Sequence, residues 1–223
     1  MMKGEFDMKS FAVLGLGRFG SELAIQLSRQ GEDVIAVDRD RKCVDAVADE
    51  VTRAVTANFR EQDVLEELGI NTCDVVILSV GSDLALSVVT LMYLKALGTP
   101  RIICKAYDDM YKEVLLRLGA DEVILPESEV ADKLSARLAS SHLRDYLKLS
   151  DDTAIQERNT PSAWCGKTIG ELKIRNRYKI NVIALRRNAE TIISIDADTQ
   201  LLEGDIVVLL GNITDLEPVL KMP

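Results

Sequence analysis

Residues 11–38 read FAVLGLGRFGSELAIQLSRQGEDVIAVD and constrain the fold more than any other stretch of the chain. An apolar run is followed by a G-x-G-x-x-G turn, an amphipathic stretch, a second apolar run and an acid. This order predicts strand, turn, helix and strand, the opening of a dinucleotide-binding fold. Gly15 suits the tight turn, Gly17 lets backbone approach a phosphate, and Gly20 allows close helix–strand packing. Asp38 is placed to bind a ribose. The alternative is a domain of this fold that keeps its glycines and binds no ligand.

Short β-branched runs alternate with amphipathic stretches as far as about residue 125. The runs are FAVLG, DVIAVD, TRAVT, DVVILSV, RIICKA and DEVILP. Such alternation predicts an α/β domain with a doubly wound, Rossmann-like parallel sheet, whose ligand crevice lies at the carboxyl ends of the strands. Beyond the glycine turn, the residues that directly follow or end these strands are therefore candidates for nucleotide binding: Asp38, Arg39, Ala57, Asn58, Gly81 and Lys105.

Residues 127–149 carry apolar side chains near helical spacing, which predicts a long helix that leaves the first domain. These side chains are Val130, Leu134, Leu138, Tyr146 and Leu147. Packing on another subunit and packing back on its own sheet are both open for this helix. From about residue 152, short strands, a hairpin at residues 188–190 and a final helix predict a small α+β domain. We therefore expect a leader (1–7), a nucleotide-binding domain (8–126), a connecting helix and linker (127–151) and a second domain (152–223).

The composition, 47% hydrophobic and 28% charged, is typical of a soluble globular protein. The longest uncharged run, residues 84–94, is too short to cross a bilayer. The first residues contain no apolar signal-peptide segment, so a cytoplasmic location is expected. A net charge of −9 argues against nucleic-acid binding, which usually requires a basic face.

Motifs along the whole chain resemble the RCK family, whose members regulate K⁺ conductance. They are GLGRFG, the acid of AVD, TAN, CKA, LPE and a final module ending in LLEGDIVVLLG. The order is that of an RCK-N domain (TrkA-N) followed by an RCK-C domain (TrkA-C), and a single unit per chain is most similar to the free-standing gating subunits of Ktr-type potassium uptake systems. The resemblance implies a cytoplasmic ring of subunits, commonly an octamer, attached to the inner face of the membrane through an integral-membrane K⁺-translocating partner. It also implies that ATP, ADP or NAD(H) binds in the RCK-N crevice and changes the shape of the ring.

Arg18 and Phe19 lie inside the glycine turn, where a guanidinium suits a polyphosphate more highly charged than a pyrophosphate. The resemblance implies that Arg18 reaches the terminal phosphates of ATP in its own or a neighbouring subunit. The alternative is an ion pair with Glu22, one turn further on. A carboxylate at Asp38 disfavours the 2′-phosphate of NADP(H), even though Arg39 follows it.

Three further residues have two interpretations each. Asn58 resembles the adenine-side contact of the family, and it is also suited to an Asx turn that caps the next helix. Lys105 suits a phosphate or a neighbour's acid. The resemblance implies that Glu127 helps to hold Mg²⁺ or Ca²⁺ between two nucleotide sites, since hard cations prefer oxygen ligands. The alternative is an acid favoured by the start of a helix.

The second domain contains a stretch that resembles the region where some Ktr-type RCK-C domains bind cyclic di-AMP across a dimer. Its candidate ligand residues are Ile174, Arg175, Asn181 and Val182, with Tyr178 beside them. Lys179 departs from the family pattern, which commonly has a small residue there. The alternative is an apolar dimer patch with solvated basic residues.

An NAD-dependent oxidoreductase and a nucleotide sensor with a different partner are the two alternatives to a regulatory subunit. An NAD-dependent oxidoreductase would need proton-transfer residues, yet the chain has no Y-x-x-x-K pair, its single histidine, His142, is expected on the connecting helix, and its second domain is small. The sequence therefore predicts a protein that is not an enzyme. A nucleotide sensor with a different partner stays open, because fold alone does not determine function.

Overall fold

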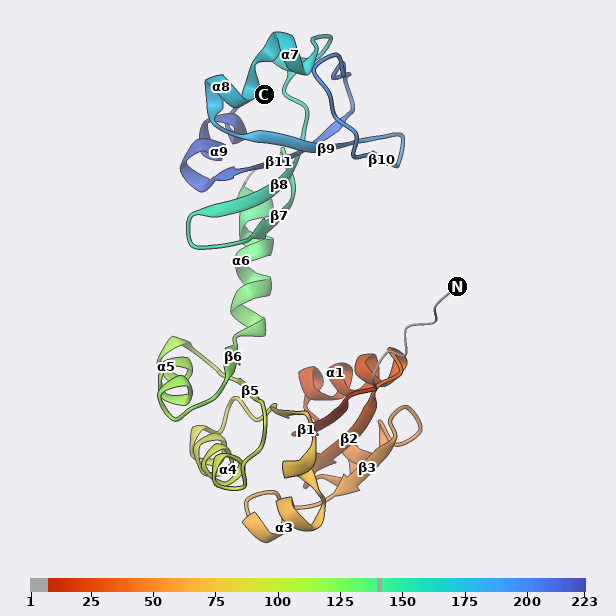
Figure 1. Cartoon of the computed structure of the whole chain (residues 1–223), viewed down its shortest axis with the longest axis vertical. Coiled ribbons are helices and arrows are strands. Elements are labelled where there is room, and N and C mark those ends of the chain that lie inside the picture. The colour runs from red at the N-terminus through yellow and green to blue at the C-terminus, as the bar shows by residue number, and fades with distance from the viewer. Residues whose placement is uncertain (1–7, 140–141) are drawn as a thin grey trace. The chain divides into compact units, whose positions relative to one another are not determined.

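The structure, a computed structural model, describes residues 8–139 and 142–223 (Figure 1). The chain forms two compact units, one ending at Pro126 and the other beginning at Glu127. Each unit has its own sheet and its own hydrophobic core. None of the helices in the described part of the chain has the length and apolar character that a bilayer crossing requires.

Six parallel strands form the sheet of the first unit, in the order β3-β2-β1-β4-β5-β6. They are β1 (Ser10–Leu14), β2 (Asp33–Asp38), β3 (Arg53–Thr56), β4 (Val75–Leu78), β5 (Ile102–Lys105) and β6 (Glu122–Ile124). The helices between them are α1 (Arg18–Arg29), α2 (Arg41–Asp45), α3 (Gln62–Glu67), the 3₁₀ turn η1 (Ile70–Thr72), α4 (Leu84–Ala96) and α5 (Asp109–Arg117). This order confirms the predicted doubly wound sheet. The winding reverses at β1, which pairs with β2 on one side and β4 on the other.

Helices cover both faces of this sheet, which is why its central strands are almost continuously apolar. On one face α1 and α2 contribute Ala24 and Val44 to a buried cluster. On the other face α3, α4 and α5 contribute Leu65, Leu91 and Leu115. This packing fixes the carboxyl ends of β1, β2 and β4 next to one another, where the crevice was expected.

The second unit begins with α6 (Pro126–Ala139) and then forms a five-stranded antiparallel sheet, in the order β10-β9-β11-β8-β7. The strands are β7 (Leu143–Lys148), β8 (Thr153–Asn159), β9 (Asn181–Arg187), β10 (Glu190–Ile192) and β11 (Ile206–Asn212). The shorter elements are the 3₁₀ turn η2 (Ser162–Trp164) and helices α7 (Ile169–Leu172), α8 (Ile174–Tyr178) and α9 (Ile213–Leu220). The hairpin between β9 and β10 was predicted. Its turn is left-handed at Asn188 (φ 50) and Ala189 (φ 67).

The predicted helix over residues 127–149 is wrong beyond Ala139. Residues 140–141 lie outside the described residues, and Leu143–Lys148 form strand β7, in which Tyr146 pairs with Gln156. A strand forms here because the backbone of β8 pairs with these residues in an antiparallel ladder. These backbone hydrogen bonds outweigh the helical spacing of two apolar residues, Tyr146 and Leu147. His142 accordingly lies in a turn directly before β7 and not on the helix.

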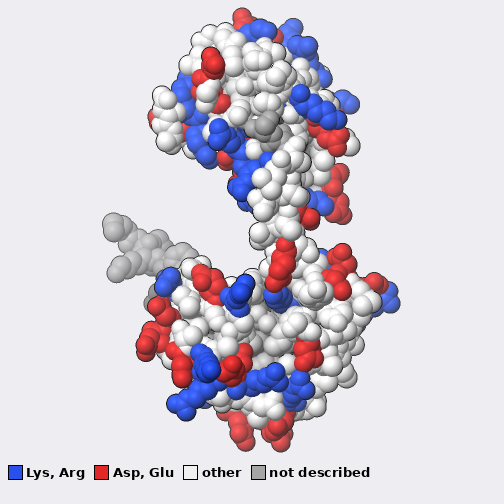
Figure 2. Space-filling view, turned by 180° about the vertical axis from the view of Figure 1, so that it is seen from behind, with Lys and Arg blue, Asp and Glu red and all other residues white. Residues whose placement is uncertain are grey.

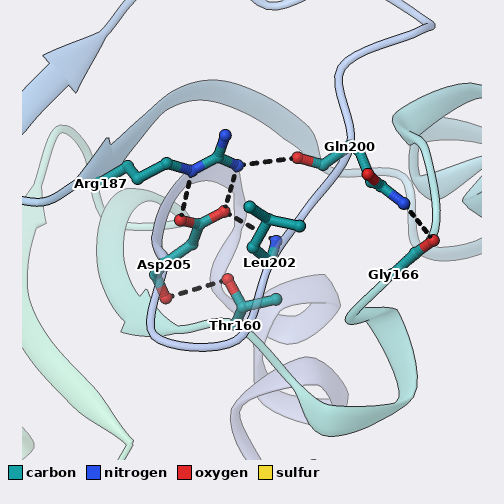
Figure 3. Close-up of polar contacts among 6 residues, drawn as sticks. All are labelled: Thr160, Gly166, Arg187, Gln200, Leu202 and Asp205. Carbon is teal, nitrogen blue, oxygen red and sulfur yellow. Dashed lines mark hydrogen bonds and ion pairs between the residues drawn. The ribbon is translucent and has the colours of Figure 1, made fainter.

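An ion pair with a buried carboxylate and a half-buried guanidinium joins β9 to the turn before β11 (Figure 3). Arg187 donates from Nε to Oδ1 of Asp205 at 2.8 Å and from Nη2 to Oδ2 at 2.7 Å, and Nη2 also reaches the carbonyl of Gln200. Asp205 is 2% exposed, and its carboxylate also accepts from the backbone N–H of Leu202. Hydrogen bonding to Arg187 keeps the pKa of Asp205 below its ordinary value. The ion pair between Arg187 and Asp205 therefore attaches the end of β9 to the start of β11.

Arg158, on β8, is a fully buried cation, 0% exposed. Its guanidinium donates to the backbone carbonyls of Asn159, Val219 and Met222. Val219 is near the end of α9, where the helix dipole favours a positive charge. Burial lowers the pKa of Arg158 to about 10. This side chain therefore joins the sheet to the last helix of the second unit.

Candidate functional site

A crevice of about 330 Å³ lies at the carboxyl ends of the central strands of the first unit. Four segments form it: the glycine turn after β1, the end of β2, the loop after β3 and the loop after β4. Its lining residues are Gly15, Gly17, Asp38, Arg39, Asp40, Phe59, Ser79, Val80, Ser82, Asp83 and Leu86. The crevice is thus at the switch point of the sheet, where parallel α/β folds bind their ligands.

The glycine turn is close-packed on one side and open on the other. Gly15 has φ +95, and a Cβ there would lie 2.7 Å from a side-chain carbon of Val80. A Cβ on Gly20 would lie 2.0 Å from the carbonyl oxygen of Gly15, so α1 packs directly on the turn. A Cβ on Gly17 would meet nothing within 4 Å. Gly17 precedes α1 and supplies no side-chain cap, so the first N–H groups of the helix face the opening.

Both oxygens of the Asp38 carboxylate are engaged with backbone. Oδ2 accepts from the N–H of Leu16 at 2.6 Å, and Oδ1 accepts from the N–H of Asp40 at 2.8 Å. Each carboxylate oxygen has a second lone pair, so the group can still accept from ribose hydroxyls. Arg39, the next residue, is exposed and also lines the crevice.

The other predicted residues of the glycine turn lie at its outer side. Arg18 is exposed, and among the described residues no ion pair joins it to Glu22, which instead accepts from Gln26 at 2.8 Å. Lys105, at the end of β5, places its ammonium 5.7 Å from the centre of the Phe19 ring, a cation–π distance. Because Glu22 is bonded to Gln26, the ion pair between Arg18 and Glu22 that the sequence offered as an alternative is not formed.

Ala57, Asn58 and Gly81 lie around the crevice without lining it. The N–H of Ala57 donates to the carbonyl of Asp38, which ties β3 to the end of β2. Asn58 is exposed and makes a long Asx-turn contact of 3.4 Å with the N–H of Arg60. It does not cap α3, because Glu61 occupies the N-cap position. Gly81 is buried against Lys105, whose carbonyl oxygen would lie 3.0 Å from an added Cβ.

Seven lining residues were not predicted: Asp40, Phe59, Ser79, Val80, Ser82, Asp83 and Leu86. The hydroxyl of Ser79 is buried and has no hydrogen-bond partner among the described residues, so it is available to a ligand. Asp83 caps α4 by accepting from the N–H of Leu86. The signal for Ser79, Val80, Ser82 and Asp83 is their place after β4, in the loop for which the sequence predicted only Gly81. Phe59 follows β3 in the same way, next to the predicted Asn58.

Glu127 is exposed in the first turn of α6, together with Glu129. This is the position that the helix dipole favours for an acid. Among the described residues no group of three or more His, Cys, Asp or Glu side chains is arranged to bind a metal. A cation at Glu127 would therefore need oxygen ligands from another source, such as nucleotide phosphates.

A second pocket, of about 260 Å³, lies in the second unit. It brings together all four predicted ligand residues with others, namely Ile169, Gly170, Ile174, Arg175, Ile180, Asn181, Val182, Ile195, Asp196 and Ala197. Arg175 donates from Nε to Oδ1 of Asn181 at 2.7 Å. Tyr178 is not part of the lining, and its ring lies 5.8 Å from that of Trp164.

Lys179 ends α8 in the left-handed conformation, with φ 57. A residue without a bulky Cβ substituent adopts this conformation more readily, which explains why a small residue suits the position. Lys179 does not line the pocket.

The charges on the surface are mixed. Figure 2 shows acidic and basic side chains interspersed on the face of each unit that it draws.

Comparison with known proteins places these features in a family. The chain matches the family model of the TrkA-N domain over residues 11–126 and that of the TrkA-C domain over residues 157–222. It is 36% identical to Ktr system potassium uptake protein C of Bacillus subtilis, over 93% of this chain and 94% of that protein. It is 33% identical to Ktr system potassium uptake protein A of the same organism, over 96% of each.

Solved structures share the fold. The crystal structure of the GsuK RCK domain superposes with a TM-score of 0.68 at 17% identity, covering 98% of this chain and 48% of that one. Fold and sequence together define a two-domain α/β protein, with a dinucleotide-type first domain and a small second domain. The chain belongs to the TrkA-N/TrkA-C family, which includes the Ktr potassium uptake proteins. The resemblance noted in the sequence is thereby confirmed.

Proposed function

We propose that the protein is a nucleotide-sensing regulatory subunit of a potassium uptake system. The main support is a crevice with the geometry of a nucleotide site in a chain 36% identical to a Ktr system potassium uptake protein. The ligand is ATP, ADP or NAD(H). Its phosphates lie over the glycine turn, where the first N–H groups of α1 and the positive end of its dipole favour anions. Its ribose binds Asp38.

Each nucleotide-binding residue has a distinct proposed role. Gly15, Gly17 and Gly20 allow the close approach of the phosphates, Arg18 binds the terminal phosphates of ATP, and Phe19 supports Lys105 beside them. Arg39, Ala57 and Asn58 border the base, and Gly81 lets the loop after β4 pack closely on β5. Because Arg18 is exposed and not paired with Glu22, its guanidinium can turn towards a third phosphate without breaking an ion pair.

Regulation follows from a difference in binding. A ligand shifts an equilibrium only by as much as its affinities for the two states differ. ATP and ADP differ in the charge presented to Arg18, so they can favour different arrangements of the first units in a homo-oligomeric ring. The ring attaches at the cytoplasmic face of the membrane to an integral K⁺-translocating subunit and opens or closes its path.

Two further ligands belong to this proposal. Glu127 helps to bind Mg²⁺ or Ca²⁺ together with nucleotide phosphates. The pocket of the second unit binds cyclic di-AMP, with the guanidinium of Arg175 at a phosphate and the apolar side chains against a base. The hydrogen bond from Arg175 to Asn181 already orients that guanidinium.

The alternative functions make different demands on the crevice. Hydride transfer by an oxidoreductase needs a proton donor or acceptor near the substrate. Among the described residues that line the crevice there is no His, Tyr or Lys. A nucleotide sensor with another partner would use the same crevice and would differ only in what it regulates.

Binding and flux measurements test the proposal. Light scattering with and without ATP, ADP and NADH is expected to show a homo-oligomer whose size or shape changes with the nucleotide. Rubidium flux through a Ktr-type membrane subunit in vesicles is expected to differ between ATP and ADP only when this protein is present. A monomer that oxidises NADH with a small substrate would contradict the regulatory function, as would flux that is indifferent to the protein.

A further inference from the structure

An ion pair crosses one end of the crevice, between the loop after β3 and the loop after β4. Nη2 of Arg60 lies 2.8 Å from Oδ2 of Asp83, 23 residues further along the chain. Asp83 lines the crevice, and so does Phe59, the residue directly before Arg60. The pair therefore joins two of the four segments that form the crevice.

Asp83 is the fixed member of this pair. Its other oxygen, Oδ1, accepts from the N–H of Leu86 at 2.9 Å and caps α4. That helix is packed firmly on the sheet, with Leu91 and Leu94 fully buried. One carboxylate thus caps a rigid helix and attaches Arg60 to it at the same time.

The loop after β3 has few other attachments. Ala57 is bound to the end of β2 through its N–H, and Phe59 is 5% exposed in the core. Between them, Asn58 is exposed and makes only local contacts, at 3.2 Å to Glu61 and 3.4 Å to the N–H of Arg60. The ion pair is therefore the one long-range polar contact of residues 58–61 within the part of the chain that the structure describes.

We propose that Arg60 is a positioning residue of the nucleotide site. It acts through Asp83 to hold the loop after β3, so that Phe59 and Asn58 keep a fixed position beside the base. The inference rests on the proposed nucleotide function and adds a residue to it. The proposed role of Arg60 is to pair with Asp83 and not to bind phosphate. Its effect is therefore shared by ATP, ADP and NAD(H), which have the adenine in common.

The test compares Arg60→Met with Arg60→Lys and with a control, Arg41→Met, in the full chain. Arg41 forms an exposed ion pair with Asp45 at 3.6 Å within helix α2, so it joins no two loops, and it does not line the crevice. Hydrogen exchange of residues 57–61 and calorimetric affinities for ATP and ADP are measured for each variant. Arg60→Met is expected to exchange faster in this loop and to lose about threefold in affinity for both nucleotides, the effect of an exposed ion pair. Arg60→Lys should restore part of the affinity, and Arg41→Met should match the wild type.

The possible outcomes separate the two proposals. Normal nucleotide binding by the wild type with unchanged affinity in Arg60→Met would refute the positioning role alone. A larger loss for ATP than for ADP would refute it too, since Arg60 would then contact phosphate. A wild-type protein that binds no nucleotide would refute the proposed function, and the positioning role with it. Faster exchange together with equal affinity losses supports the positioning role.

Discussion

The carboxylate of Asp38 lies 2.6 Å from the backbone nitrogen of Leu16, so the acid at the end of β2 holds the glycine turn that follows β1. Leu16 is only 2% exposed, and its N–H has no ready replacement for this acceptor. The residue proposed to bind the ribose therefore also shapes the turn proposed to bind the phosphates. Folding of the turn and recognition of the ligand depend on the same side chain.

Asp38→Ala is expected to lower the free energy of unfolding of the first unit by about 1–3 kcal/mol, because it leaves the buried N–H of Leu16 without an acceptor. Asp38→Asn keeps one acceptor oxygen for the N–H of Leu16 but loses the acceptor for the N–H of Asp40, so only part of the stability should return while ATP binding stays weak. Urea unfolding followed by far-ultraviolet circular dichroism measures the change, and fluorescence of the single tryptophan, Trp164, reports on the second unit independently. An Asp38→Ala protein as stable as the wild type would contradict this role.

Gly20→Ala and Gly17→Ala should separate folding from binding. At Gly20 a Cβ would lie 2.0 Å from the backbone of Gly15, so we expect a loss of about 3 kcal/mol or more in the stability of the first unit. At Gly17 a Cβ meets nothing within 4 Å, so the fold should survive. Nucleotide affinity should still fall in Gly17→Ala, because the methyl group occupies the path of a phosphate. Thermal unfolding and ATP titration of both variants decide this, and normal ATP binding by Gly17→Ala would place the phosphates elsewhere.

Arg18→Ala is expected to weaken ATP more than ADP or NAD(H). The exposed guanidinium is proposed to contact the terminal phosphates, and a charge-assisted contact of this kind is worth about tenfold in affinity. Isothermal titration with the three nucleotides measures the losses. Equal losses for all three would remove the proposed role of Arg18 in distinguishing them.

The pair of Arg187 and Asp205 predicts a pH dependence for the second unit. The pKa of Asp205 is lowered in the folded state from an ordinary 3.8, so its contribution to stability is complete above that value. The contribution is lost as the pH falls from 3.8 through the lower folded pKa. Trp164 fluorescence during urea unfolding between pH 6 and pH 3 should show the fall, and Asp205→Asn should make it shallower.

Arg187→Met tests the same pair at neutral pH. It leaves Asp205 buried without its main partner, so we expect a loss of about 2–4 kcal/mol in the stability of the second unit. Arg186→Met is the matched control, because Arg186 pairs with the more exposed Glu157 on the same sheet. Equal losses in the two variants would mean that burial of Asp205 adds nothing to the pair.

In the second unit, Arg175→Ala is expected to weaken cyclic di-AMP binding about tenfold, because it removes a charge-assisted contact to phosphate. Arg177→Ala on the same helix is the control. Arg177 lies over the ring of Tyr178 at 5.6 Å and does not line the pocket. Calorimetry measures the affinity of each variant for cyclic di-AMP. Equal affinities would show that cyclic di-AMP does not bind in this pocket.

Glu127→Gln addresses the proposed cation. If Glu127 helps to bind Mg²⁺ or Ca²⁺ beside the nucleotide, removing its charge should make ATP affinity less dependent on either cation. Titrations of ATP with each cation and with a chelator compare the variant with the wild type. The same cation dependence in both proteins would leave Glu127 as an acid favoured only by the helix dipole.

The first unit could be predicted well from sequence because its strands are buried on both faces and read as continuous apolar runs. Strand β7 could not, since Tyr146 and Leu147 continue the helical spacing of α6, and an edge strand of six residues has little alternation of its own. Residues 143–148 form a strand because they pair with the antiparallel strand β8, and local sequence does not specify that pairing.

In the candidate site, too, some residues could be predicted from local sequence and others depend on long-range strand pairing. Gly15, Gly17 and Asp38 could be placed in the crevice because their spacing reflects one local strand–turn–helix unit. Ser79 and Asp83 enter the crevice only because β4 pairs with β1, although paired residues such as Phe11 and Val75 are 64 positions apart in the chain. Long-range pairing, and not residue type, determines which loops meet there.

Arg158 makes the folding of the second unit depend on residues near the end of that unit. The guanidinium lies on β8, but two of its three carbonyl partners, Val219 and Met222, are made more than 60 residues later. While the chain is still emerging from the ribosome, closing the sheet would bury a cation whose acceptors have not yet appeared, which is costly. The second unit is therefore complete only when α9 is present, and a chain that stops before this helix is expected to be far less stable than the full unit.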